Sequence, residues 1–236
     1  MTLTAINSLH DPRVANILDQ LHEAAKGDRW RMPLKIPRLA FAMLRGKKMW
    51  DAITPEMMAD VFIPVSRDQG VMLNLLAKLI NAQRIVEFGT SFGISTIYLA
   101  AAVRDNGGGT VIGTELEPTK HATASRNLDE AGLSDCVDIR LGDAMETLRD
   151  IDGPVDMVLL DGWKDLYIPV LELITPKLRP GAVVMADNIF TFKRSLRPYV
   201  DYVQNGKNQF ESTTLELGEG LEFSIYRGGH QPDTTD

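Results

Sequence analysis

From Arg84 onward, short runs of apolar and β-branched residues alternate with longer segments of helical spacing. The apolar runs are Arg84–Phe88, Thr110–Thr114, Val137–Leu141, Val155–Leu160 and Ala182–Ala186. The helical segments between them are Ile94–Val103, Thr119–Ala131, Ala144–Arg149 and Leu166–Leu178. Several runs are almost continuously apolar, as expected of parallel strands that are covered on both faces. The alternation therefore predicts an α/β fold with a mostly parallel, twisted sheet and helices on both faces.

The carboxy-terminal part of the chain departs from this alternation. Phe210–Leu217 and Leu221–Tyr226 both have strand character, and only Gly218, Glu219 and Gly220 connect them. So short a connection permits an antiparallel hairpin but no parallel crossover. We therefore expect an antiparallel hairpin at one edge of the sheet.

The amino-terminal part has helical patterns instead. Arg13–Ala25 repeats apolar residues at helical spacing, and Ser66–Gln69 fits a capping box that opens a helix reaching Ile80. We expect residues 1–65 to form a helical cap on the same domain, residues 66–228 to form the main domain, and residues 229–236 to be a flexible tail. The expected architecture is Rossmann-like.

Composition excludes several classes of protein. The net charge of the 236 residues is −7, although residues 1–50 hold nine Lys/Arg and only four Asp/Glu. The rest of the chain is therefore strongly acidic, which argues against a general nucleic-acid-binding protein. A single cysteine, Cys136, excludes a disulfide framework and a cysteine-rich metal site.

Hydropathy gives no sign of a membrane span. The longest apolar runs, such as Leu39–Leu44, are far shorter than the ~20 residues that a spanning helix needs. The first ten residues lack the basic and apolar regions of a signal peptide. We therefore expect a cytoplasmic protein without a transmembrane segment.

The first predicted strand leads into a glycine-containing turn, Gly89–Gly93, and then into a helix. Such a turn lets the backbone approach a ligand closely, although the spacing differs from that of dinucleotide sites and also suits a simple tight turn. Glu115 follows the second strand, where a carboxylate can accept both ribose hydroxyls of an adenosine ligand or can be a solvated charge. Glu87 suits a cationic ligand, or it can bond to loop N–H groups.

Oxygen-bearing side chains follow two later strands. Asp161 follows Val155–Leu160, and Asp187 and Asn188 follow Ala182–Ala186. Two carboxylates and an amide suit Mg²⁺, although strand-end aspartates are often only turn residues. Lys164 is a candidate base near neutral pH, because burial and nearby positive charge lower the pKa of a lysine. Its alternative is a surface lysine paired with Asp165, and Trp163 can stack on an adenine or pack into the core.

These motifs resemble a known family. Val86–Gly89 through Ser95, then Glu115, then Asp161-x-Trp163-Lys164-Asp165-x-Tyr167, and then Ala186-Asp187-Asn188 resemble the metal-dependent class I S-adenosylmethionine O-methyltransferases. Within that family the pattern is most similar to the catechol O-methyltransferases. The resemblance covers about Ser66–Gly228.

The resemblance implies a role for each matching residue. The residues implied to hold S-adenosylmethionine are Glu87, Gly89, Ser91, Gly93, Ser95, Glu115, Asp143, Ala144, Asp161 and Trp163. The implied ligands of Mg²⁺, or of another hard divalent cation, are Asp161, Asp187 and Asn188. Lys164 is the implied catalytic base, and the residues implied to contact the substrate are Lys164, Asn188 and Glu216.

The sequence departs from the family pattern at several positions. Gly162 stands where the family has a histidine, and Gly142–Met145 replaces a Ser-Gln pair near the adenine, so that Asp143 becomes the acceptor for the adenine amino group. The aromatic gate expected near Val61 is absent. The last hairpin loop is shorter, which leaves Glu216, or otherwise Glu211, as the glutamate that orients the substrate.

The resulting expectation is an S-adenosylmethionine- and Mg²⁺-dependent O-methyltransferase that methylates one hydroxyl of a vicinal aromatic diol. One alternative is an NAD(P)-dependent oxidoreductase on the same fold class. The other is a non-catalytic module that docks on a membrane or polyanion through the basic stretch Lys26–Lys48. Expected partners are a small aromatic diol, no nucleic acid, and a second copy of the chain bound through the N-terminal helices.

Overall fold

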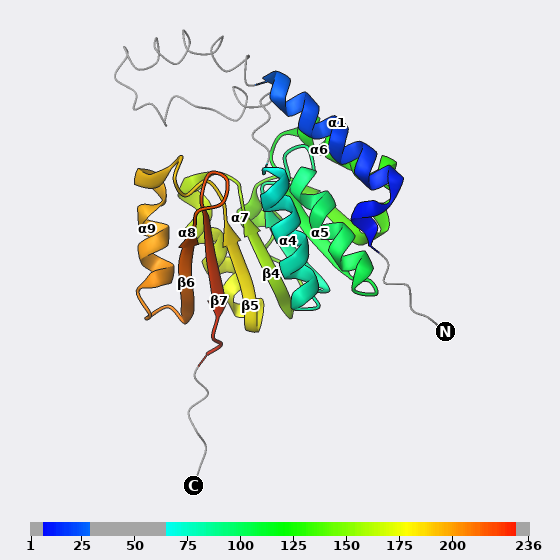
Figure 1. Ribbon diagram of the computed structural model, residues 1–236. Helices are drawn as coiled ribbons and strands as arrows, with labels where there is room; N and C mark the ends of the chain where they lie inside the picture. Colours follow the sequence, from blue (N-terminus) through cyan, green and yellow to red (C-terminus); the bar gives the residue numbers. More distant parts are fainter. Residues whose placement is uncertain (1–6, 29–64, 230–236) are drawn as a thin grey trace, which may run out of the picture.

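A seven-stranded mixed sheet forms the centre of the computed structural model, which describes residues 7–28 and 65–229 (Figure 1). Its strand order is β3-β2-β1-β4-β5-β7-β6. The strands are β1 (Arg84–Phe88), β2 (Thr110–Glu115), β3 (Val137–Leu141), β4 (Val155–Leu160), β5 (Leu178–Ala186), β6 (Phe210–Leu215) and β7 (Leu221–Tyr226). Strands β1 to β5 pair in parallel, whereas β7 is antiparallel to both β5 and β6. The expected parallel sheet and antiparallel hairpin are therefore confirmed.

The register brings the carboxyl ends of the central strands to one edge. Phe88 of β1 pairs with Leu160 of β4, and Leu160 pairs in turn with Ala186 of β5. The chain order reverses beside β1, because β2 lies on one side of it and β4 on the other. In open α/β sheets, ligands bind outside the carboxyl ends of the strands at such a reversal.

Helices cover both faces of the sheet. One face packs against α4 (Arg67–Leu79), α5 (Ile94–Asp105) and α6 (Pro118–Glu130), and the other against α7 (Ala144–Thr147), α8 (Tyr167–Ile174) and α9 (Lys193–Gln204). Alternate strand residues supply the two cores: Ile85 of β1 belongs to the first, and Val86 to the second. The short 3-10 helices are η1 (Ser8–His10), η3 (Ser134–Cys136), η4 (Lys164–Leu166) and η5 (Thr175–Lys177).

Most differences from the expected elements lie at proline or glycine. The helix expected over Leu166–Leu178 ends at Ile174, and η5, which contains Pro176, follows it. Strand β5 begins at Leu178 rather than Ala182, ahead of the Arg-Pro-Gly segment that interrupts its apolar pattern. Helix α9 is not among the expected helices, and it contains Pro198 in its interior.

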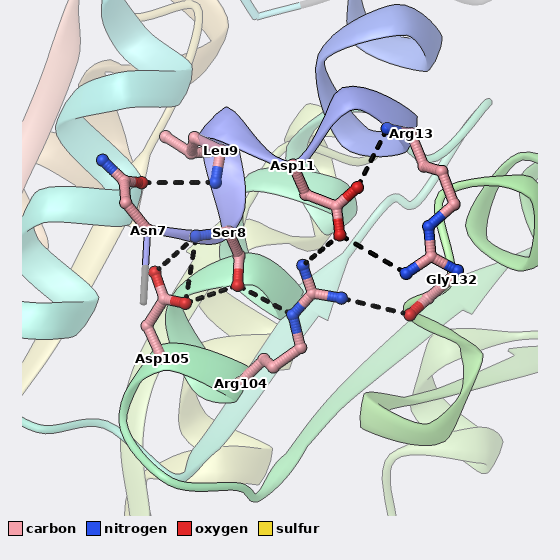
Figure 2. Close-up of polar contacts among 8 residues, drawn as sticks. All are labelled: Asn7, Ser8, Leu9, Asp11, Arg13, Arg104, Asp105 and Gly132. Atoms are coloured by element: carbon pink, nitrogen blue, oxygen red, sulfur yellow. Dashed lines mark hydrogen bonds and ion pairs between the residues drawn. The ribbon is translucent and has the colours of Figure 1, made fainter. Parts of the chain in front are cut away.

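The first described helix, α1 (Pro12–Asp28), packs on the outside of α5 and α6. Figure 2 shows the polar contacts at its start. The backbone N–H of Ser8 donates to the carboxylate of Asp105 at 3.1 Å, and the guanidinium of Arg104 donates to Ser8 Oγ at 2.7 Å and pairs with Asp11 at 3.7 Å. Both partner residues lie at the carboxy-terminal end of α5, which therefore fixes the position of η1 and α1.

Parts of three expectations fall outside the described residues. These parts are residues 1–6 and 29–64 of the N-terminal cap, including Val61, most of the basic stretch Lys26–Lys48, and residues 230–236 of the tail. No helix within 7–28 or 65–229 is long and apolar enough to cross a membrane.

Candidate active site

The turn between β1 and α5 brings its backbone against the end of β4. Gly89 has φ +97°, and a Cβ atom at this position would lie 2.7–2.8 Å from backbone atoms of Asp161 and Gly162. Gly93 has φ +86° and precedes the first residue of α5. Ser91 adopts φ +50° between them. The turn therefore requires glycine at two of its positions, in agreement with the close backbone approach predicted from the sequence.

Glu87 is fully buried at the end of β1, directly beneath this turn. Its Oε2 atom accepts hydrogen bonds from the hydroxyls of Thr90 and Thr96, whereas Oε1 makes no hydrogen bond to any residue in the described part of the chain. Burial raises the pKa of Glu87, and the hydroxyls of Ser95, Thr96 and Thr90 partly oppose that rise. A buried carboxylate with one free oxygen suits a ligand that carries an ammonium group.

Glu115 lies at the end of β2 and is held by backbone donors. Its Oε2 atom accepts from the N–H of Ser91 and its Oε1 atom from the N–H of Glu117, each at 2.8 Å. Glu115 thereby connects the Gly89–Gly93 turn to the start of α6. A carboxylate oxygen has two acceptor positions, so each oxygen can also accept from a ribose hydroxyl.

Three other predicted cofactor residues lie at the ends of neighbouring elements. Asp143 is exposed and caps α7, where its side chain accepts from the N–H of Met145 at 2.8 Å. Ala144 is buried in the first turn of the same helix. Trp163 is 37% exposed and precedes η4, so it is not part of the described core.

The predicted metal ligands meet at the ends of β4 and β5. Asp161 directly follows β4, and Asp187 directly follows the paired end of β5. Asn188 adopts φ +66°, a conformation that asparagine tolerates better than most residues. Asp187 is 2% exposed, and its Oδ1 atom accepts from the N–H of Asn188 at 2.7 Å. The structure therefore brings together the three oxygen-bearing side chains that the sequence singled out.

Lys164 places its ammonium group among these oxygens. Its Nζ atom donates to Asn188 Oδ1 at 2.6 Å and to the Tyr167 hydroxyl at 2.7 Å, and it lies 3.4 Å from Asp161 Oδ1. The rings of Tyr167 and Phe192 lie 4.9 Å and 5.2 Å from the same atom. Asp165, the alternative partner, is exposed. Lys164 is thus part of the buried cluster and not a surface lysine.

Burial shifts every ionisable group of this cluster toward its neutral form. It raises the pKa of Asp161 to about 8, and the ammonium of Lys164 opposes this rise while the Asp187 carboxylate adds to it. Burial also raises the pKa of Asp187 and lowers the pKa of Lys164. Two carboxylates this close in a buried place need positive charge nearby to remain ionised.

The donor chemistry fits a hard divalent cation. No group of three or more Cys, His, Asp or Glu side chains converges within the described residues, so the set is limited to two carboxylates and one amide. Two of the three side chains, Asp161 and Asn188, already contact one cation, the Lys164 ammonium. Oxygen ligands in this number leave coordination positions for water and substrate, as Mg²⁺ sites do.

Gly162, which stands at the position of the family's histidine, makes room for an aromatic ring. A Cβ atom on Gly162 would lie 2.5–2.7 Å from the ring of Phe88 at the end of β1. The absence of a side chain at Gly162 is therefore matched by the large ring of Phe88.

Two residues at the site were not predicted from the sequence. Gln69 donates to Asp187 from the start of α4, and the charge of Glu219, in the β6–β7 loop, raises the pKa of Asp187. Glu216 is exposed just after β6. Glu211 pairs with Ile225, which lies opposite Val183, and so it is remote from the strand ends that carry Asp187. Glu219 therefore acts on the site through the charge of Asp187.

Comparison with known proteins gives a consistent set of similarities. A family model described as a methyltransferase domain matches residues 86–189. The catechol O-methyltransferase of Niastella koreensis is 40% identical over 131 residues, which cover 54% of this chain and 58% of that protein. The catechol O-methyltransferase of Mycobacterium tuberculosis is 40% identical over 129 residues, covering 54% of this chain and 57% of that protein. The chain thus spans less than two thirds of the length of these two relatives.

A solved structure supports the same relationship over more of the chain. The O-methyltransferase TomG from Streptomyces achromogenes, in complex with SAM, superposes with a TM-score of 0.65 and 29% identity, covering 72% of this chain and 87% of that one. The strand order, the turn over Glu87 and the Asp161, Asp187 and Asn188 cluster agree with these similarities. The chain is therefore similar to the class I S-adenosylmethionine-dependent O-methyltransferases, and among them to the catechol O-methyltransferases.

Proposed function

We propose that the protein methylates one hydroxyl of a vicinal aromatic diol, with S-adenosylmethionine as methyl donor and Mg²⁺ as the metal. The observation that carries this proposal is the cluster of Asp161, Asp187, Asn188 and Lys164 beside the turn over Glu87. This cluster combines three side chains whose oxygens can bind a metal with one basic group, at the edge of the sheet where the Gly89–Gly93 turn lies. The names of the relatives support the diol as substrate, and the similarity to methyltransferases favours this function over the NAD(P)-dependent alternative.

The cofactor would lie across the ends of β1 and β2. Glu87 offers its free Oε1 atom to the ammonium group, and Glu115 offers its remaining acceptor positions to the ribose hydroxyls. Asp143 and Trp163 would lie beside the adenine, with Ser91 and Ser95 nearer the amino-acid end. When bound, S-adenosylmethionine supplies an electrophilic methyl group on its sulfonium.

Asp161, Asp187 and Asn188 would hold the metal through their side-chain oxygens. When bound, Mg²⁺ makes a coordinated hydroxyl more acidic and orients it. Lys164 accepts the proton of the reacting hydroxyl at Nζ, because burial lowers the pKa of this lysine and so favours its neutral form. We assign the hydrogen bond from the second hydroxyl to Glu219, because its charge acts on Asp187 and its backbone carbonyl accepts from the N–H of Phe190.

A methyl-transfer assay tests the proposal. The protein is incubated with S-adenosylmethionine and a panel of catechols and caffeoyl-type esters, and the products are identified by mass spectrometry. We expect methylation of vicinal diols only, with anisole-type and single-hydroxyl analogues as matched controls. Full turnover in excess EDTA would contradict the metal, and methylation of single hydroxyls at the same rate would contradict the diol.

A further inference from the structure

Gln69 connects a helix start to the catalytic edge of the sheet. It is the third residue of α4, and its side chain completes the capping box by accepting from the N–H of Ser66 at 2.9 Å. Its Nε2 atom donates at 2.7 Å to Oδ1 of Asp187, a residue 118 positions further along the chain. Gln69 is 2% exposed, so neither bond competes with bulk water.

The bond fixes which oxygen of Asp187 remains available. Oδ1 of Asp187 accepts two hydrogen bonds, from Gln69 and from the N–H of Asn188, each at 2.7 Å. Within the described part of the chain, Oδ2 accepts none. The carboxylate is thereby held in one orientation with a single oxygen free to bind a cation.

The β6–β7 loop is shaped around the same side chain. Gly218 has φ +58°, and a Cβ atom there would overlap the side-chain amide of Gln69. The next residue, Glu219, is the acid whose charge acts on Asp187. Helix α4, the end of β5 and the hairpin loop therefore meet at one amide group.

We propose that Gln69 is a positioning residue for the metal site, which acts by orienting the carboxylate of Asp187. This inference rests on the proposed function, because it assigns Asp187 to a divalent cation. Groups that orient metal ligands typically change metal affinity by ~10–100-fold when they are removed. Gln69 therefore contributes to metal affinity without contacting the metal or the substrate.

The test separates the bond to Asp187 from the helix cap. Gln69→Met keeps the length of the side chain but removes both its donor and its acceptor. Ser66→Ala removes the hydroxyl half of the same capping box and leaves the bond between Gln69 and Asp187 intact. Magnesium chloride is titrated by calorimetry into each full-length protein in the presence of S-adenosylhomocysteine, and the affinity of S-adenosylhomocysteine without metal serves as the check of the cofactor site.

We expect Gln69→Met to weaken Mg²⁺ binding by ~10-fold or more. Ser66→Ala should stay within about threefold of the wild type, and neither variant should change S-adenosylhomocysteine affinity in metal-free buffer. In turnover, Gln69→Met should need more Mg²⁺ for half-maximal rate yet reach nearly the wild-type kcat at saturating Mg²⁺. A purely structural role would lower kcat and cofactor affinity together.

Gly218→Ala provides a second variant, in which neither Gln69 nor Asp187 is substituted. Its Cβ atom would push the amide of Gln69 away, so we expect weaker Mg²⁺ binding here as well. Wild-type Mg²⁺ affinity in Gln69→Met, or an equal loss in Ser66→Ala, would overturn the positioning role and leave the proposed function intact. A wild-type protein that methylates diols but binds no divalent cation would overturn the metal site and this inference with it.

Discussion

At the scale of single residues, the contacts of the Lys164 ammonium group say most about the chemistry of the site. Its ammonium contacts an amide oxygen, a phenol oxygen and a carboxylate oxygen in a place that is mostly closed to water. This arrangement stabilises the positive charge, whereas burial opposes it and lowers the pKa of the lysine. A group balanced in this way can exchange a proton with a substrate hydroxyl.

Two substitutions distinguish a proton acceptor from a fixed charge. Lys164→Ala should lower kcat by ~10²–10⁴, the usual contribution of a positioned acid or base. Lys164→Arg keeps the charge but cannot lose its proton, so it should be impaired to a similar extent. The measurement is kcat at saturating substrate, with Asp165→Ala at an exposed neighbouring position as the control. An arginine variant with near-normal kcat would show that only the charge is needed.

Phe88 and Gly162 pack directly against each other at the ends of β1 and β4. Gly162→Ala should destabilise the protein by ~1–3 kcal/mol, because the added methyl group overlaps the ring of Phe88. The double variant Phe88→Leu/Gly162→Ala should recover part of this loss, because a smaller side chain leaves room for the methyl group. Urea unfolding of both single variants and the double variant gives the coupling energy. Strictly additive effects would contradict direct packing between the two positions.

At the scale of elements, the sequence predicted β1, β3, β4 and β7 at their observed bounds. Each of these strands is followed directly by a glycine or a charged residue, which ends its apolar pattern. Helix α9 could not be recognised in the same way, because Pro198 lies inside it and charged residues surround the apolar positions Leu196, Tyr199 and Val203. Its burial depends on packing with the other helices and the sheet, which the local sequence does not show.

The same limit applies to the candidate site. The motif residues Asp161, Asp187 and Asn188 were predictable because each follows an apolar strand. The capping box of Ser66 and Gln69 was also recognisable, but its contact with Asp187 depends on how α4 lies across the sheet. Glu219 was visible in the sequence only as part of a tight loop. Contacts between distant segments are set by tertiary packing, and a single sequence carries no local signal for them.

Helix α1 is held against α5 partly through a buried histidine. His22 Nε2 lies 3.3 Å from the Tyr98 hydroxyl, and burial lowers the pKa of His22 below 6.5, with the charge of Arg67 adding to the shift. Lys26 acts in the same direction, whereas Asp19 and Glu23 oppose it. The folded protein therefore favours neutral His22.

This shift predicts a pH dependence of stability. Because the unfolded histidine binds a proton at higher pH than the folded one, the contribution of His22 is complete above about pH 7.5 and is lost as the pH falls through 6.5. The free energy of unfolding should therefore drop more between pH 7.5 and 5.5 in the wild type than in His22→Gln. Urea unfolding at pH 7.5 and at pH 5.5 gives the change in unfolding free energy for each protein. Subtracting the change in His22→Gln from that in the wild type removes the opposite trend of the buried acids, which both proteins share. Equal changes in the two proteins would remove His22 as the cause.

At the scale of the whole molecule, two cores on opposite faces of one sheet support a site along its edge. The site residues come from segments that are far apart in the sequence, from Gln69 to Glu219, so the site exists only when the sheet is complete. Lys164 reaches its place from η4, beside both acidic strand ends. The fold thus assembles the acidic cluster together with a cation of its own.

Thermal unfolding should reveal this internal cation. Removal of Mg²⁺ with EDTA should change the Tm of the wild type little, because Lys164 remains to neutralise the carboxylates. Lys164→Met should be destabilised by ~3 kcal/mol in EDTA, the lower part of the range for a buried ion pair that loses one partner. Millimolar Mg²⁺ should restore part of that loss in the variant. A Tm response to Mg²⁺ of the same size in both proteins would contradict the role of Lys164 as the internal cation.

The resident ammonium also has a practical consequence for handling the protein. A cluster of buried carboxylates without a positive charge of its own would be destabilised when a soluble ion is removed. Because Lys164 lies among the acidic side chains, we expect protein stripped with chelator to stay folded and to accept Mg²⁺, Mn²⁺ or Ca²⁺ from one common stock. Ion preference can therefore be compared on a single preparation, free of differences in folding history.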